Sequence, residues 1–162
     1  MGNYMYNILF VCMGNICRSP SAEGFFKHHL ASSGIAALVA TDSAGTHSYH
    51  LGYPPDPRAV SEAGNFGVDI SALRARKIVP ADFGQFDLIL GMDHQNLALI
   101  EQMQPGQSRA RSALIMDYAT GTSYEEVPDP YYGTQKDFTL MCELLTEATR
   151  NLLSELESQL GS

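Results

Sequence analysis

One stretch near the start of the chain decides the fold that we expect: Ile8-Leu9-Phe10-Val11-Cys12-Met13-Gly14-Asn15-Ile16-Cys17-Arg18-Ser19-Pro20. Its first five residues form an unbroken apolar run, which is typical of a strand that is buried on both faces of a parallel sheet. Its end predicts the start of a helix, because Ser19 is a good helix cap and Pro20 fits a first helical turn. The stretch therefore predicts a strand, a short loop and a helix, the opening unit of an α/β fold.

The same alternation of apolar runs and amphipathic stretches continues along the chain. Further strands are expected at 37–41, 86–90 and 113–116. Helices are expected from Pro20 to before Gly34, at 58–66, from the third strand to about 103, and over the apolar stripe 141–160. These elements predict one domain over residues 1–162, with a four-stranded parallel sheet flanked by helices on both faces. Ligands of such sheets bind where the strands end, which directs attention to Cys12.

The composition is that of a globular, acidic protein. Hydrophobic residues make up 44% of the 162 residues, enough for a complete core. The net charge of −8 argues against nucleic acid or an anionic membrane as a partner, because their phosphates would repel the protein. Residues 120–162 hold eight carboxylates and two bases, so a site for a negatively charged ligand is expected nearer the amino terminus.

The cysteine count and the amino-terminal sequence predict a cytoplasmic protein. Three cysteines, an odd number, do not form a disulfide framework for a chain of this size, and they fit a reducing compartment. The first apolar run, 8–12, is too short for a secretion signal or a membrane span. No pattern of cysteines or carboxylates converges with the histidines at 28, 29, 47 and 50, so we expect no metal site.

The loop from Cys12 to Arg18 has the residues of an oxyanion site. The five residues between them can curl into a ring of inward-pointing backbone N–H groups at the amino terminus of a helix. Gly14 and Asn15 tolerate the left-handed dihedral angles that such a ring requires. Arg18 adds a guanidinium that can hold two phosphate oxygens, and the same N–H groups favour the Cys12 thiolate. The loop is therefore suited to phosphoryl transfer onto sulfur.

Phosphoryl transfer of this kind also requires a proton donor for the leaving group, and one candidate lies far along the chain. Asp129 stands between two prolines, so its loop is stiff and its carboxyl can be aimed. Tyr131 and Tyr132 follow it and can wall a slot for an aromatic ring. Without Cys12, Asp129 would be interpreted only as a turn residue.

These two segments together resemble the low-molecular-weight protein tyrosine phosphatases. Residues 12–20 are similar to the family's signature loop, and residues 129–133 are similar to its general-acid loop. Three further segments are also similar: Asp42-Ser43-Ala44-Gly45-Thr46, Asp56-Pro57-Arg58-Ala59 and Met92-Asp93. The resemblance covers nearly the whole chain and implies a flavodoxin-like phosphatase fold. It also implies hydrolysis of protein phosphotyrosine and small aryl phosphates through a phosphocysteine intermediate, without a cofactor.

The resemblance further implies a role for each candidate residue. Cys12 is the expected nucleophile and Arg18 the expected phosphate ligand. Asp129 is the acid expected to protonate the phenolic oxygen and then to activate water. The phosphate-binding loop would consist of Met13, Gly14, Asn15, Ile16, Cys17 and Arg18. Inorganic phosphate and vanadate would then act as inhibitors.

Supporting residues are implied in the same way. Ser19 would donate a hydrogen bond to the Cys12 thiolate, and Asn15 would brace the loop with Ser43 as a partner. One departure bears on this network: many relatives carry a histidine that helps to brace Asn15, and this chain has Leu73 there. The bracing network, though not the chemistry, is therefore in question.

The resemblance also implies the substrate cleft and a redox response. The cleft would be lined by Tyr49, Tyr131 and Tyr132. Cys17 would form a reversible disulfide with Cys12 under peroxide and so protect the nucleophile. Cys142 lies on the apolar side of the expected terminal helix and is interpreted as a packing residue.

Four other functions fit parts of the sequence less well. Thioredoxin-coupled arsenate reductases resemble the loop, but they use two further cysteines in a mobile segment, and only Cys142 is left here. Phosphocysteine carriers of sugar transport need neither Arg18 nor a paired acid. An inactive phosphate-binding module would not need Asp129. Protein-arginine phosphatases resemble the family but carry Thr where this chain has Ile16 and lack the double tyrosine, so phosphotyrosine is favoured.

Overall fold

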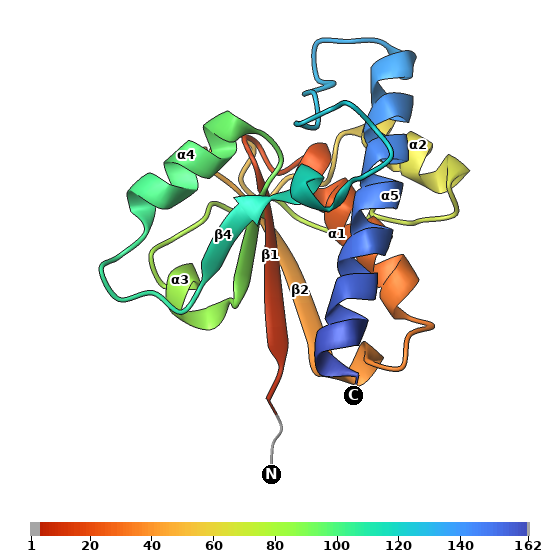
Figure 1. Cartoon of the computed structure of the whole chain (residues 1–162). Helices are drawn as coiled ribbons and strands as arrows, with labels where there is room; N and C mark the ends of the chain where they lie inside the picture. Colours follow the sequence, from red (N-terminus) through yellow and green to blue (C-terminus); the bar gives the residue numbers. More distant parts are fainter. Residues whose placement is uncertain (1–3, 162) are drawn as a thin grey trace.

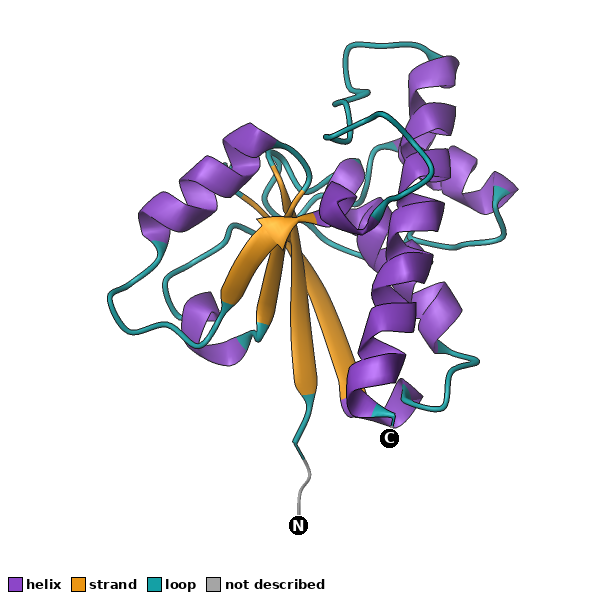
Figure 2. Cartoon of the chain, in the orientation of Figure 1, coloured by secondary structure: helices purple, strands orange, loops and turns teal. Residues whose placement is uncertain are grey.

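A computed structural model describes residues 4–161 of the chain. Its centre is a sheet of four parallel strands: β1 (Tyr6–Cys12), β2 (Val39–Gly45), β3 (Leu88–Gly91) and β4 (Arg111–Leu114). Their order is β2-β1-β3-β4, so β1 lies inside the sheet (Figures 1 and 2). In this register Cys12 at the end of β1 lies beside Gly45 at the end of β2. The predicted four-stranded parallel α/β sheet is confirmed.

Helices cover both faces of this sheet (Figure 1). On one face lie α1 (Arg18–Leu30), α2 (Pro57–Asn65) and α5 (Gln135–Leu160). On the other face lie α3 (Asp82–Gln85) and α4 (His94–Met103). The apolar run of β1 explains the two layers, because successive side chains of a strand point to opposite faces. Ile8 and Phe10 enter the larger core with α1 and α5, whereas Leu9 and Val11 enter the smaller core under α3 and α4.

The strand boundaries differ from the prediction where an apolar run does not coincide with a strand. β2 continues to Gly45 rather than ending at 41, because an edge strand accommodates half-buried polar residues such as Asp42. The fourth strand is Arg111–Leu114 rather than 113–116, because the chain turns into a 3₁₀-helix at Ile115–Tyr118. Ile115 and Met116 are buried from that helix rather than from the strand.

The helix starts also differ from the prediction. α1 begins at Arg18, and Cys17 rather than Ser19 occupies its cap position. Ser19 is instead a fully buried residue of the first helical turn. α5 begins at Gln135, ahead of the apolar stripe at 141, because Thr134 and Asp137 form a capping box there. The short helix α3 was not predicted, since four residues are too few to show a helical period.

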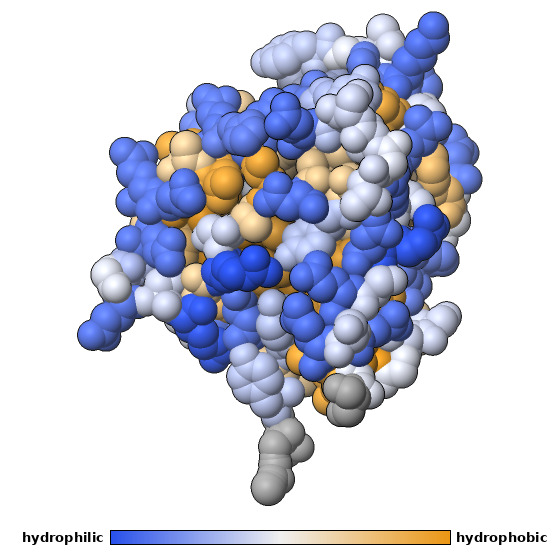
Figure 3. Space-filling model, in the orientation of Figure 1, coloured by the Kyte–Doolittle hydropathy of each residue, from blue (hydrophilic) through white to orange (hydrophobic). Residues whose placement is uncertain are grey.

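The surface is mainly polar. Figure 3 shows hydrophilic residues over most of the face seen in Figure 1, with smaller hydrophobic areas between them. Within residues 4–161, no helix is both long enough and apolar enough to span a bilayer.

Candidate active site

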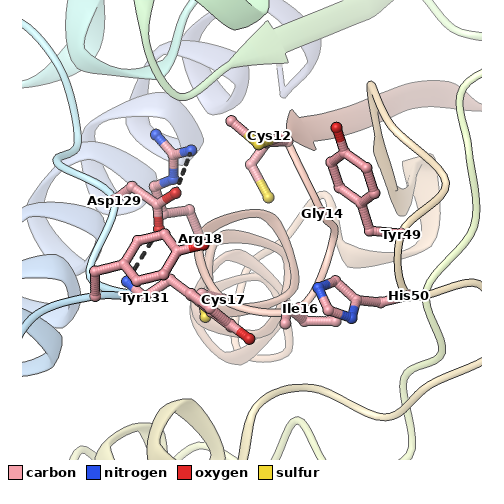
Figure 4. Close-up of a pocket in the computed structure, with 11 residues that line it drawn as sticks. Cys12, Gly14, Ile16, Cys17, Arg18, Tyr49, His50, Asp129 and Tyr131 are labelled. Atoms are coloured by element: carbon pink, nitrogen blue, oxygen red, sulfur yellow. Dashed lines mark hydrogen bonds and ion pairs between the residues drawn. The ribbon is translucent and has the colours of Figure 1, made fainter.

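A cavity of about 330 Å³ opens at the carboxyl end of β1, where the sequence placed the site. It is lined by Cys12, Met13, Gly14, Ile16, Cys17, Arg18, Tyr49, His50, Asp129, Tyr131 and Tyr132. Figure 4 shows the Cys12 thiol in the middle, with Asp129 and Tyr131 to one side and Tyr49 and His50 to the other. Three segments far apart in the sequence therefore meet around one sulfur atom.

The 12–18 loop is anchored around its rim by backbone hydrogen bonds. The carbonyls of Cys12 and Met13 accept from the N–H groups of residues 46 and 47, at 2.8 and 3.0 Å. The carbonyl of Ile16 accepts from the N–H of residue 56 at 2.9 Å. Gly45 makes this close packing possible, because a Cβ there would lie only 2.6 Å from the Met13 carbonyl oxygen. The loop is thus fixed before any ligand binds.

The Cys12 thiol lies at the amino terminus of α1, a position that favours its anion. Its Sγ is 3.0 Å from the Ser19 hydroxyl oxygen and accepts from the Ser19 backbone N–H at 3.4 Å. The helix dipole adds partial positive charge at this end. Ser19 therefore lies where the resemblance places a donor to sulfur.

Asn15 has φ +58°, in the left-handed region, where a non-glycine residue costs about 1–3 kcal/mol unless its surroundings hold it. Its buried side-chain amide bonds through both of its N–H donors and through its oxygen. Nδ2 donates to Ser19 Oγ at 2.8 Å and to Ser43 Oγ at 3.0 Å, and Oδ1 accepts from the Arg76 backbone N–H at 2.9 Å. Since Ser19 Oγ accepts from Asn15, its own hydrogen can point at the Cys12 sulfur at 3.0 Å, with the Ala44 carbonyl as a longer alternative at 3.4 Å.

Leu73 does not leave this network incomplete. Its side chain is partly buried and packs against the larger core. The Asn15 amide is satisfied by Ser19, Ser43 and the Arg76 backbone instead. The departure from the family pattern at residue 73 thus leaves no unpaired polar group on Asn15.

Arg18 is 2% exposed and is held by a residue to which the sequence reasoning gave no role. Its Nη1 lies 2.6 Å from Asp93 Oδ2 and donates to the Val127 carbonyl at 3.1 Å. Burial alone would lower the pKa of Arg18, but the nearby Cys12 and Asp93 raise it overall, so the guanidinium stays charged. Asp93 could have been found from its position, because it lies two residues after the end of β3, at the carboxyl end of the sheet where Cys12 lies.

The Asp129 carboxyl points toward the Arg18 guanidinium from the loop that precedes α5. Its Oδ2 is 3.6 Å from Arg18 Nη2, and its Oδ1 accepts from the Tyr131 N–H at 3.1 Å. The loop is tied down because the Val127 N–H donates to the Met92 carbonyl at the end of β3. The Asp129 carboxyl is 40% exposed, so it can exchange protons with water.

Aromatic rings form the walls of the cavity mouth. Tyr131 is 36% exposed and its ring lies 4.8 Å from that of Tyr132, whereas Tyr132 is 94% exposed and borders the cavity only loosely. Tyr49 stacks on His47 on the opposite wall. His50, which the sequence suggested only as a rejected metal ligand, lies on the same side of the cavity as Tyr49, with its ring 6.2 Å from that of Tyr131.

Arg58 holds the backbone of Tyr131, which lines the cavity, in place. Its guanidinium pairs with Asp56 at 2.8 Å and donates to the Tyr131 carbonyl at 3.0 Å. The hydrogen bonds from Arg58 hold the pKa of Asp56 below its usual range, against the opposing effect of burial. The segment 56–58, which the sequence reasoning quoted only for its similarity to the family, therefore has a place in the site.

All three cysteines are free thiols, and two of them, Cys17 and Cys142, resist ionisation. Burial raises the pKa of Cys17 far above its usual range, and that of Cys142 to about 12. Cys142 is packed in the larger core, as interpreted from the sequence. Among residues 4–161, no group of three or more histidine, cysteine or carboxylate side chains is placed to hold a metal ion.

Comparisons with known proteins agree with this geometry. Residues 7–161 match the family described as "Low molecular weight phosphotyrosine protein phosphatase". A putative low-molecular-weight protein-tyrosine-phosphatase of Synechocystis is 44% identical, over 94% of this chain and 98% of its own. A low-molecular-weight phosphotyrosine protein phosphatase of Schizosaccharomyces pombe is 39% identical, over 92% and 96%.

A solved structure is similar over the same range. The crystal structure of a protein tyrosine phosphatase from Entamoeba histolytica, with Hepes in its active site, superposes with a TM-score of 0.91. It is 36% identical, over 95% of this chain and 98% of its own. The match of family, sequence and fold extends across both the 12–18 loop and the Asp129 loop. This chain belongs to the low-molecular-weight phosphotyrosine protein phosphatases.

Proposed function

We propose that this chain, as one phosphatase domain over residues 1–162, hydrolyses protein phosphotyrosine and small aryl phosphates through a phosphocysteine intermediate. One observation carries the proposal: the Cys12 thiol, the Arg18 guanidinium and the Asp129 carboxyl line one cavity. A nucleophile, an anion ligand and an acid are the three groups that this reaction requires.

In the first step the Cys12 thiolate attacks phosphorus. The new S–P bond forms as the P–O bond to the aryl group breaks, and Asp129 donates its proton to the departing phenolic oxygen. Backbone N–H groups of residues 13–18 and the Arg18 guanidinium hold the three non-bridging oxygens and stabilise their charge in the transition state. Asp93 supports this step because its Oδ2 holds the Arg18 Nη1 at 2.6 Å.

In the second step water cleaves the S–P bond. The Asp129 carboxylate, now deprotonated, accepts a proton from the attacking water, and inorganic phosphate leaves. The sulfur departs as a thiolate, which the Ser19 hydroxyl stabilises from 3.0 Å. Phosphate and vanadate would inhibit by occupying the same ring of N–H groups.

The walls of the cavity favour an aryl ester. Tyr49 and Tyr131 offer ring faces on opposite sides of the thiol, which suits a phenyl ring better than a flexible alkyl chain (Figure 4). Ile16 presents no hydroxyl to orient the hydrolysis of a P–N bond, so phosphoarginine is disfavoured. The net charge of −8 favours a protein substrate over nucleic acid or an anionic membrane, and the free cysteines favour the cytoplasm.

Oxidation would be limited by the neighbouring thiol. Peroxide converts the Cys12 thiolate to sulfenic acid with release of hydroxide, and attack by the Cys17 thiol then forms the disulfide with release of water. Both cysteines line the cavity, which supports this pairing. Burial raises the pKa of Cys17, so it does not compete with Cys12 as a nucleophile toward the phosphate ester. In the disulfide step its proton leaves with the sulfenic acid oxygen as water.

The test is turnover of p-nitrophenyl phosphate without added metal, beside Cys12→Ser. The wild-type protein should turn over and form a phosphoprotein intermediate that a rapid denaturing quench traps, and Cys12→Ser should do neither. A phosphotyrosine peptide, a phosphoarginine peptide and arsenate with thioredoxin separate the three chemistries. Turnover by Cys12→Ser at a near-normal rate would remove the sulfur from the mechanism.

A further inference from the structure

The Asn15 amide that braces the loop is held between two separate pieces of the chain. Its Nδ2 donates to Ser43 on β2, at 3.0 Å. Its Oδ1 accepts from the backbone N–H of Arg76 at 2.9 Å. The segment that contains Arg76 lies along the end of β2, since the Gly45 N–H donates to the Arg76 carbonyl and the Ile78 N–H donates to the Gly45 carbonyl. The spacing between this segment and β2 therefore sets the position of Asn15.

The side chain of Arg76 bridges the elements that define this spacing. Its Nε lies 3.0 Å from Asp42 Oδ2 on β2, and its two terminal nitrogens lie 3.1 Å from the two carboxylate oxygens of Asp82 on α3. Asp82 is 3% exposed and also accepts from the Val79 N–H at 2.8 Å. A bidentate guanidinium pair fixes both distance and orientation, which a single contact does not.

The same bridge reaches the other partner of Asn15. Asp42 directly precedes Ser43, and its Oδ1 accepts from the Ser43 N–H at 2.8 Å. The Arg76 side chain thus orients Ser43 through Asp42. The Arg76 backbone N–H binds the oxygen of the same Asn15 amide. From there the contacts run through Asn15 to Ser19 and to the Cys12 sulfur, at 2.8 and 3.0 Å.

We propose that Arg76 is a positioning residue for the reaction of Cys12. Its bridge between Asp42 and Asp82 holds the Asn15 amide, and through it the Ser19 hydroxyl, in the arrangement that stabilises the thiolate. The proposal rests on the proposed function, because it assigns a purpose to the geometry around the nucleophile. It also identifies what this chain uses in a region where Leu73 supplies no polar group.

The alternative interpretation is that Arg76 contributes only to the stability of the fold. A second arginine–aspartate pair, Arg109 with Asp87, serves as a control that distinguishes a positioning role from a stabilising one. Arg109 makes a bidentate contact with Asp87, at 2.9 and 3.2 Å. The side chains of Arg109 and Asp87 are 43% and 9% exposed, and those of Arg76 and Asp82 are 33% and 5% exposed. The two pairs are therefore buried to a comparable extent. The Arg109–Asp87 pair lies at the amino-terminal ends of the strands, away from Cys12. Asp87 precedes β3 and accepts from the Asn7 N–H near the start of β1.

The experiment compares Arg76→Met, Arg76→Lys and Arg109→Met. Three quantities are measured: urea unfolding, kcat/KM for p-nitrophenyl phosphate, and the pH profile of Cys12 alkylation by iodoacetate. We expect both methionine variants to lose comparable stability. Only Arg76→Met should move the alkylation profile to higher pH. Only this variant should also lower kcat/KM, by about 10-fold, because the displacement of Ser19 should be smaller than the 1 Å misplacement that costs roughly 100-fold. Arg76→Lys should recover part of both.

Two results would overturn the proposal. One is an Arg76→Met protein that is destabilised but keeps the wild-type alkylation profile and kcat/KM. The other is an Arg109→Met protein that changes as much as Arg76→Met. If Arg76→Met does not fold, Asp42→Asn removes only the β2 arm, whose carboxylate is 48% exposed, and should shift the same profile by less. A wild-type protein that fails to hydrolyse any aryl phosphate would refute the proposed function, yet the alkylation profile would still test Arg76.

Discussion

The contact between Asp93 and Arg18 allows a sharp test of how the phosphate ligand is held. Asp93 uses both of its carboxylate oxygens: Oδ2 contacts Arg18 at 2.6 Å, and Oδ1 accepts from the Asn96 N–H at 2.7 Å as the cap of α4. Asp93→Asn has one amide oxygen, which can keep the cap because Asn and Asp are equally good caps, and its NH₂ then faces Arg18. The substitution therefore removes the charge and the acceptor that face the guanidinium but keeps the helix cap.

The expected loss of stability follows from burial. Removing one partner of a buried ion pair costs about 3–5 kcal/mol, because the other charge is left uncompensated. Here Arg18 is 2% exposed, but the Asp93 carboxyl is 19% exposed, and Arg18 keeps the Val127 carbonyl and Asp129 at 3.6 Å. We therefore expect a loss below that range, about 2–3 kcal/mol. Asp93→Ala should lose about 1 kcal/mol more, because the helix cap goes as well.

The activity should fall because the guanidinium loses its short contact with Asp93 and is held less well in place. We expect kcat/KM for p-nitrophenyl phosphate to drop about 10- to 100-fold in Asp93→Asn, the scale of a displacement of up to 1 Å at a reacting group. Urea unfolding and steady-state kinetics measure the two quantities on the same protein. If Asp93→Asn lies within about 0.5 kcal/mol of wild type and keeps its kcat/KM, the reasoning about Arg18 is wrong.

Three further outcomes are expected. Asp129→Ala should slow the release of poor phenolic leaving groups most; equal losses for p-nitrophenyl phosphate and phenyl phosphate would contradict the acid role. Iodoacetamide at pH 8 should modify Cys12 and leave Cys142, whose pKa of about 12 keeps it a thiol, and mass spectrometry of wild type and Cys12→Ser checks this. Tyr131→Ala should raise KM for aryl phosphates several-fold, whereas Tyr132→Ala, at a 94% exposed position, should change it about twofold at most, as steady-state kinetics would show.

The sequence alone predicted the four-stranded parallel sheet and the place of the candidate site. The 8–12 run is apolar at every position, which only a strand covered on both faces explains, and the Gly-Asn loop before a helix points to an anion site. Cys12, Arg18 and Asp129 could be named because each has a chemistry that a turn or a core does not need in that combination. The boundaries of β2 and β4 were less accurate, because the edge of a strand is set by pairing with its neighbour and not by hydropathy.

Only the tertiary structure decided what holds these groups in place. Asp93 and Arg76 contact Arg18 and Asn15 across 75 and 61 residues of sequence, and no local pattern relates such distant positions. These groups meet, the Asp93 side chain with Arg18 and the Arg76 backbone N–H with Asn15, because parallel strands end on the same side of the sheet and bring the following loops together. Local sequence carries the chemistry of a residue, whereas hydrogen bonds and ion pairs between distant segments exist only once the core has closed and fixed their separation.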